Sequence, residues 1–128
     1  MATRGVRGAT TVPADTKEHV LAATRELLSG ILAANPGMSA DDIASAFFTV
    51  TDDIVSVHPA LAARQMGWGR VPLMCAREIP VPDSLRLCIR ALIHWNTDAP
   101  QEQIRHVYLR DAAQLRPDLA DQTQEKTR

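Results

Sequence analysis

Two arginines in this sequence lie in runs that provide no counter-charge. Arg90 lies in the apolar run LCIRALI at 87–93, and Arg7 lies in the neutral run VRGATTV at 6–12. A guanidinium held in apolar surroundings is costly unless an opposite charge pairs with it. The partner of each arginine must therefore come from a distant part of the chain or from a ligand. We expect an anion-binding site.

Other kinds of catalytic chemistry have little support in the sequence. The 4 histidines show no zinc-ligand spacing, so we expect no metal site. The sequence contains no GxGxxG, GxxxxGK[ST] or GxSxG motif, so nucleotide binding and acyl hydrolysis have no motif on which to rest. The side chains left for chemistry are the arginines together with Cys75, Glu78 and Tyr108.

Length and composition restrict the class of protein. The chain has 128 residues, 45% hydrophobic and 23% charged, which predicts one domain with a buried core. A net charge of -1 with scattered basic residues argues against a nucleic-acid partner. The N-terminus lacks the apolar core of a signal peptide, and no apolar stretch is long enough to span a bilayer. We expect a cytoplasmic protein with no membrane partner.

The elements that position these side chains begin with a strand and a helix. A segment rich in β-branched residues predicts a strand over residues 3–12, with two glycines as points of close approach. Asp15 and Glu18 have the spacing of a capping box, and apolar residues then recur on one helical face. This pattern predicts a helix over residues 15–34.

The rest of the chain reads as short strands with one further helix. The apolar run over residues 84–95 fits either a buried strand or a helix, and we favour a strand. The other predicted elements are strands over 44–50, 71–76 and 104–109, a short helix over 59–66 and a loose polar tail over 120–128.

This order of elements predicts an α/β fold in which one sheet is covered by one principal helix. A single helix cannot cover both faces of such a sheet. The other face is expected to pack against other subunits, which predicts an oligomer.

Several separate segments resemble one enzyme family. Together they are similar to the monofunctional trimeric chorismate mutases of the Bacillus type, and the similarity runs from about residue 4 to residue 119. The segments are RGVRGATTV at 4–12, CIR at 88–90, NTD at 96–98 followed by PQ at 100–101, IRHVYL at 104–109 and LRPDL at 115–119.

The resemblance implies a homotrimer built as a pseudo α/β-barrel. Each subunit has one mixed β-sheet and one long helix, and active sites lie in clefts between subunits. The chorismate mutase-like domain spans residues 1–119, and residues 120–128 form a polar C-terminal tail. The implied reaction is the Claisen rearrangement of chorismate to prephenate, in phenylalanine and tyrosine biosynthesis, with no metal or cofactor. Such a step needs conformational restraint and stabilised charge on the ether oxygen, not a nucleophile.

The resemblance also implies roles for individual residues. Arg90 is the catalytic residue, which donates to the breaking ether oxygen and to an adjacent carboxylate. Arg7 and Tyr108 hold a substrate carboxylate. Glu78 binds the ring hydroxyl, and Cys75 contacts the same hydroxyl from the pocket wall.

The remaining matched positions lie at the edges of the implied pocket. Leu73-Met74 belong to its wall, where the compared family member has valine and threonine. Arg64 and Arg116 are cations near its mouth. The sequence departs from the family at His58, where the compared member has a phenylalanine, and at Leu61, where it has a lysine.

Each of these residues also has a structural explanation. Arg90 could form an ion pair within the fold, Glu78 could pair with Arg77, and Tyr108 could be a core residue with a satisfied hydroxyl. Arg7 could be a cation at a strand edge. Two other functions stay open: a non-catalytic trimeric module that binds small carboxylates at subunit interfaces, and a structural interaction domain in which Arg7, Arg90 and Glu78 pair without an open cleft.

Overall fold

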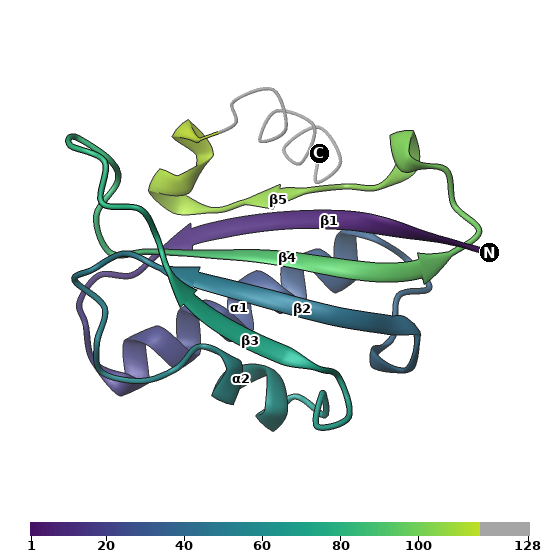
Figure 1. The fold of residues 1–128 in the computed structure, drawn as a ribbon, viewed down its shortest axis with the longest axis horizontal. Helices are drawn as coiled ribbons and strands as arrows, with labels where there is room; N and C mark the ends of the chain where they lie inside the picture. The colour runs from purple at the N-terminus through teal and green to yellow at the C-terminus, as the bar shows by residue number, and fades with distance from the viewer. Residues whose placement is uncertain (116–128) are drawn as a thin grey trace.

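The computed structural model describes residues 1–115, which form one five-stranded mixed sheet with its main helices on one face (Figure 1). The strand order is β3-β2-β4-β1-β5. β4 pairs antiparallel with both β1 and β2, while β3 runs parallel to β2 and β5 runs parallel to β1. The strands are β1 Ala2–Thr11, β2 Ile43–Val50, β3 Leu73–Arg77, β4 Cys88–Thr97 and β5 Val107–Tyr108.

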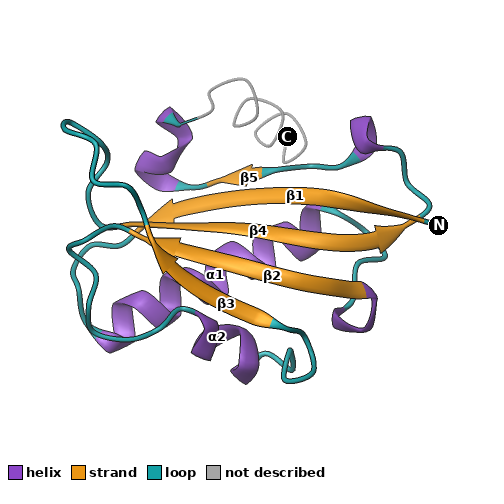
Figure 2. Ribbon diagram, viewed as in Figure 1, coloured by secondary structure: helices purple, strands orange, loops and turns teal. Residues whose placement is uncertain are grey.

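The two α-helices, α1 and α2, lie behind the sheet in Figure 2 and pack on the same face. Their apolar sides build the core there, as the predicted single covered face requires. Gly8 of β1 allows close packing, because a Cβ at this position would lie 2.8 Å from the Cδ1 atom of Ile31. The helices are α1 Lys17–Ala34 and α2 Ala60–Gln65, and three 3₁₀ turns follow the chain at η1 Ala40–Asp42, η2 Gln101–Gln103 and η3 Arg110–Gln114.

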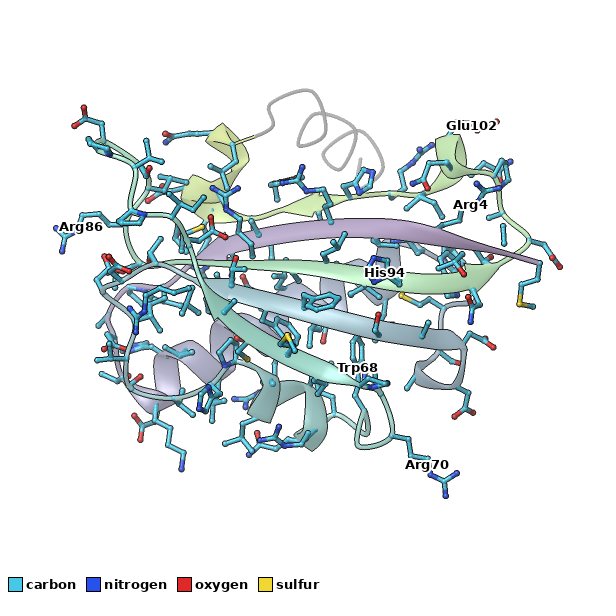
Figure 3. All side chains as sticks on the ribbon, in the orientation of Figure 1. Arg4, Trp68, Arg70, Arg86, His94 and Glu102 are labelled. Atoms are coloured by element: carbon cyan, nitrogen blue, oxygen red, sulfur yellow. The ribbon has the colours of Figure 1, made fainter. Side chains whose placement is uncertain are left out.

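The opposite face of the sheet, which we call the open face, carries neither α1 nor α2; only the 3₁₀ turn η3 packs on it among the described residues, through the contact of Ala112 with Ala9 of β1. Side chains alternate along β4 between the two faces. Ile89, Ala91 and Ile93 are buried toward the helices, whereas Arg90 and His94 occupy the alternate positions. Figure 3 shows His94 over the face turned to the viewer, away from α1. The alternation therefore places the cation Arg90 on the open face.

The first helix begins one step later than the capping-box spacing predicts. Thr16 is its N-cap, and the Thr16 hydroxyl accepts a hydrogen bond from the backbone N–H of His19. The prediction that Asp15 caps this helix is wrong. Its carboxylate instead accepts hydrogen bonds from the backbone N–H groups of Val55 and Ser56, at 3.1 Å each. Asp15 therefore binds a segment that is distant in sequence instead of capping the helix that follows it.

The strand predicted over residues 84–95 is a strand, but it is displaced toward the C-terminus. It begins at Cys88 because Leu87 has a φ of 49°, in the left-handed region that no strand accommodates. Both carboxylate oxygens of Asp53 accept the Leu87 N–H, each at 3.0 Å, which fixes this turn. At its other end the strand continues past the predicted end at residue 95, to Thr97.

The strand predicted over residues 104–109 is shorter, because side chains take over its ladder bonds. Asn35 accepts from the Arg105 N–H and donates to the Arg105 carbonyl, both at 2.9 Å. The N–H of Arg7 on β1 donates to Nδ1 of His106 at 2.9 Å, where a strand would offer a carbonyl. Regular pairing is left to Val107 and Tyr108.

The remaining predicted elements agree closely with the structure. The strand predicted over 44–50 is β2, the helix predicted over 59–66 is α2, and the strand predicted over 71–76 is β3. Within residues 1–115, none of the helices has the length and apolar content needed to cross a membrane. The predicted tail at 120–128 and the boundary at residue 119 lie outside the described residues.

Candidate active site

Four of the predicted site residues meet in one pocket of about 410 Å³ on the open face, which we call the open-face pocket. β1, β4 and β5 each contribute one of them, and register brings these together, since Ala9 of β1 lies opposite both Arg90 and Tyr108. The fourth follows the end of β3. The pocket is lined by Arg7, Gly8, Phe47, Thr49, Glu78, Arg90, Ala91, Leu92 and Tyr108.

Arg90 finds its counter-charge in Glu78. The Nε atom of Arg90 lies 3.5 Å from Oε1 of Glu78, and the two side chains are 34% and 22% exposed. The Nε atom is itself buried and makes no hydrogen bond to a described residue. Arg77, the alternative partner of Glu78, pairs with Asp52 instead. The ion pair is therefore loose and leaves Arg90 facing a cavity.

Glu78 is held from two further directions. Its backbone N–H donates to the carbonyl of Val50 at 2.8 Å, which anchors the chain where β3 ends. Its side chain turns back over the sheet, and Oε2 accepts a hydrogen bond from the hydroxyl of Thr49. The carboxylate thus has one oxygen on Thr49 and the other beside Arg90.

Arg7 and Tyr108 form the other side of this pocket. The Arg7 side chain is half-buried on the open face, and its backbone is fixed by the bond to His106. Tyr108 is buried and packs with Ala9 and Ala112. Two cations, one carboxylate and one phenol around an open cavity suit a small polyanion that also carries a hydroxyl group. The structural alternative, in which Arg7, Arg90 and Glu78 close on one another, is not what this cavity shows.

Cys75 lies apart from those four residues. It faces the core side of β3 and lines a second pocket of about 410 Å³, together with His58 and the segment preceding it. We call this the loop pocket; its lining residues are Val50, Ile54, Val55, Ser56, Val57, His58, Pro59, Cys75, Ala76 and Arg77. One protomer therefore does not bring Cys75 to the open-face pocket.

The remaining predicted residues are divided among other surfaces. Leu73 packs against the core beside Cys75, whereas Met74 between them is on the open face, where it pairs in register with Phe47. Arg64 of α2 lines a third hollow, together with Arg70. Arg116 lies outside the described residues.

Sequence reasoning missed Thr49, Phe47 and Leu92 as pocket residues. Thr49 is the one polar residue in the run AFFTV at 46–50, and it occupies the same side of β2 as Phe47. That interruption of an apolar strand was a usable signal. Its significance depends on the register, which places Thr49 opposite Arg90.

A buried thiol, that of Cys88, neighbours Arg90. Burial raises the pKa of Cys88 above its usual value, the charge of Arg90 lowers it and that of Glu78 raises it again. The thiol therefore stays neutral and adds no negative charge beside Arg90. Among the described residues no group of three or more His, Cys, Asp and Glu side chains could hold a metal ion.

Comparisons with known proteins agree on one family. The family model for chorismate mutase type I matches residues 3–119. Chorismate mutase AroH of Thermus thermophilus is 58% identical over 116 residues, covering 91% of this chain and 95% of that protein. Chorismate mutase AroH of Bacillus subtilis (strain 168) is 44% identical over 121 residues, covering 94% of each.

A solved structure gives the same result for the fold. A chorismate mutase from Clostridium thermocellum superposes with a TM-score of 0.82 at 48% identity, covering 84% of this chain and 96% of that one. The family resemblance seen in the separate motifs is confirmed by the family model and by both relatives. The chain belongs to the type I chorismate mutase family.

Proposed function

We propose that this protein converts chorismate to prephenate in phenylalanine and tyrosine biosynthesis. The observation that carries the proposal is the open-face pocket, in which Arg7, Arg90, Glu78 and Tyr108 surround one cavity. Chorismate is a dianion with an ether oxygen and a ring hydroxyl, so cations, a donor and an acceptor match its groups. In the rearrangement a C–O bond breaks as a C–C bond forms, and no proton is transferred to the protein.

Arg90 carries the catalytic role. Its guanidinium donates to the ether oxygen, on which negative charge accumulates as the C–O bond breaks, and to an adjacent carboxylate. Fixed donors aimed at developing charge are among the largest contributions to catalysis. The loose contact with Glu78, at 3.5 Å, leaves its hydrogen-bonding capacity available.

The other three residues restrain the substrate in its reactive conformation. Arg7 and Tyr108 bind a carboxylate, and Glu78 accepts a hydrogen bond from the ring hydroxyl while balancing part of the positive charge. Restraint of this kind lowers the entropic part of the barrier. The chain belongs to a family of enzymes, which favours catalysis over the alternative of a non-catalytic module that binds small carboxylates.

A homotrimer with interfacial sites completes the pocket. The open face exposes Phe47 at 40%, Leu92 at 37% and Met74 at 60%, an apolar area that a second copy would cover. Because Cys75 lies in a separate pocket of the same chain, we assign it, with Leu73 and Met74, to the wall that a neighbouring subunit adds. Arg64 and Arg116 are assigned to the mouth of the site.

The cytoplasm is the proposed compartment. Cys75 and Cys88 are both free thiols, as a reducing environment would keep them.

The test is to incubate purified protein with chorismate and follow loss of the diene absorbance. Wild type should consume chorismate, and Arg90→Lys should be nearly inactive because an ammonium cannot reproduce the guanidinium fork. Arg25→Lys is the matched control, because Arg25 is exposed on α1, on the helical side of the sheet. Unchanged chorismate with wild type, or equal rates for wild type and Arg90→Lys, would reject the proposal; mass measurement of the native protein tests the trimer.

A further inference from the structure

Thr49 lies between the two charged groups of the open-face pocket. On β2 it is opposite Arg90 of β4, and its other neighbour in register is Ala76 of β3, two residues before Glu78. It is half-buried and lines the pocket. Its hydroxyl donates to Oε2 of Glu78.

This hydrogen bond determines how the two oxygens of the Glu78 carboxylate are divided between Thr49 and Arg90. Thr49 holds Oε2, and the other oxygen, Oε1, lies 3.5 Å from Nε of Arg90. Charge-assisted hydrogen bonds are about 2.7–2.9 Å long, and arginine prefers to bind both oxygens of a carboxylate at once. The observed pair is thus longer and less complete than two such groups would form if they were free to approach.

Closing that gap would remove both groups from the substrate. A Glu78 carboxylate bound through both oxygens to Arg90 would occupy the donors needed at the ether oxygen and the acceptor needed at the ring hydroxyl. The backbone of Glu78 is anchored to Val50, so the side chain moves by rotation alone. Among the described residues, it is the Thr49 hydroxyl that donates a hydrogen bond to Oε2.

We propose that Thr49 is a positioning residue for the rearrangement, which holds Glu78 away from Arg90 and keeps both groups available to the substrate. The inference rests on the proposed function of this pocket. It also gives a reason for a polar residue in an otherwise apolar strand segment, where valine would pack equally well.

Removing only the hydroxyl tests this inference. Thr49→Val keeps the shape and the β-branch, and Thr49→Ser keeps the hydroxyl. For Thr49→Val we expect kcat/KM for chorismate to fall about 10- to 100-fold, the usual range for losing a hydrogen bond to a charged group. Both kcat and KM should change. We expect kcat to fall because Arg90 stabilises the transition state, and KM to rise because Glu78 binds the substrate. Thr49→Ser should recover most of the loss.

A double-mutant cycle separates positioning from a structural role. Glutamine at position 78 cannot form an ion pair with Arg90, so Thr49→Val in a Glu78→Gln background should change kcat/KM less than about twofold. Thr3→Val is the matched control. The Thr3 hydroxyl donates to Asn96 on the exposed end of the sheet at 2.6 Å, and its removal should leave kcat and KM unchanged.

The outcomes are distinct. A Thr49→Val protein with wild-type kcat and KM, or with a lowered melting temperature and no kinetic change, would overturn the inference and leave the proposed function intact. Equal losses from Thr49→Val in both backgrounds would also overturn it. A wild-type protein that leaves chorismate unchanged would overturn the proposed function and this inference with it.

Discussion

The open-face pocket and the loop pocket have the same volume, about 410 Å³, but different kinds of structure position their residues. In the open-face pocket, Arg7, Arg90 and Tyr108 each stand on a strand whose register fixes them. The loop pocket takes most of its lining from the consecutive residues 54–59, which belong to no strand or helix, and the rest from the ends of β2 and β3. Hydrogen bonds from backbone N–H groups to side chains, such as those that Asp15 accepts from Val55 and Ser56, hold that segment.

The difference teaches where this fold fixes chemistry and where it permits change. A one-residue slip in a strand would turn every side chain to the other face, so register is strongly specified. A loop depends on a few hydrogen bonds and tolerates substitution. The matched residues Arg7, Glu78, Arg90 and Tyr108 line the strand-built pocket, and the family departure at His58 lies in the loop pocket.

The largest expected effect compares one residue from each pocket. Arg90→Ala should lower kcat for chorismate on the order of 100- to 1000-fold, as loss of a fixed donor at developing charge does. Cys75→Ala removes only a weak hydrogen-bonding group and should cost less than about tenfold. Steady-state kinetics on both variants provide the measurement. Equal losses would show that the two pockets do not divide the work in this way.

The second-largest expected effect is on stability, and it concerns the segment that carries Tyr108. Asn35 is buried and makes hydrogen bonds to the Ile31 carbonyl and to both backbone groups of Arg105, each at 2.9 Å. Asn35→Ala leaves these groups unsatisfied and should lower the free energy of unfolding by about 2–4 kcal/mol. Urea denaturation would measure it. Asn96→Ala, at a half-buried strand end, should stay within about 0.5 kcal/mol.

A smaller, pH-dependent effect should appear in the loops. Hydrogen bonds from Ser56 and Val55 lower the pKa of Asp15. Partial burial raises the pKa of Asp53, but hydrogen bonds from Thr51 and Leu87 outweigh it, so that pKa is also lowered. A lowered carboxylate pKa gives stability that is present above the ordinary aspartate value of about 3.9 and is lost as pH falls through the folded-state value.

Amide hydrogen exchange checks this expectation residue by residue. As pH falls below about 4, the Val55, Ser56 and Leu87 amides should lose protection beyond the intrinsic pH dependence, while strand amides of β4 keep theirs. Asp15→Asn should abolish the acid-dependent change at Val55 and Ser56 and leave that at Leu87. Simultaneous loss in strands and loops would mean that the loops are not a separate unit.

Elements with local signals were predictable, and those decided by distant side chains were less so. The helix near residues 15–34 follows from its apolar period, and β1 and β2 follow from their composition. The start of β4 could not be found, because the carboxylate of Asp53 fixes the Leu87 turn from 34 positions away. The shortening at 104–109 depends on Asn35, which is 70 positions from Arg105.

The sequence also indicated most of the charged groups of the site, but it did not show which of them lie next to one another. Arg90 was recognisable as a cation without a local partner. That Glu78 is its partner could not be predicted, because the strand order brings the two residues together. Thr49 gave only a weak signal, because a threonine in a strand is ordinary until its neighbours are known. Cys75 was placed with Glu78 by family resemblance, and the alternation along β3 turns it to the other face.

By itself, the sequence determined that a guanidinium without a local counter-charge lies in an apolar strand, that one long helix covers one face of a sheet, and which family the motifs resemble. These properties are local or carried by short runs. The tertiary structure alone decided that Arg90 faces Glu78 and Thr49, and that Cys75 of the same protomer does not share their pocket. Strand order and register set those distances, and they arise from pairing between segments far apart in the chain.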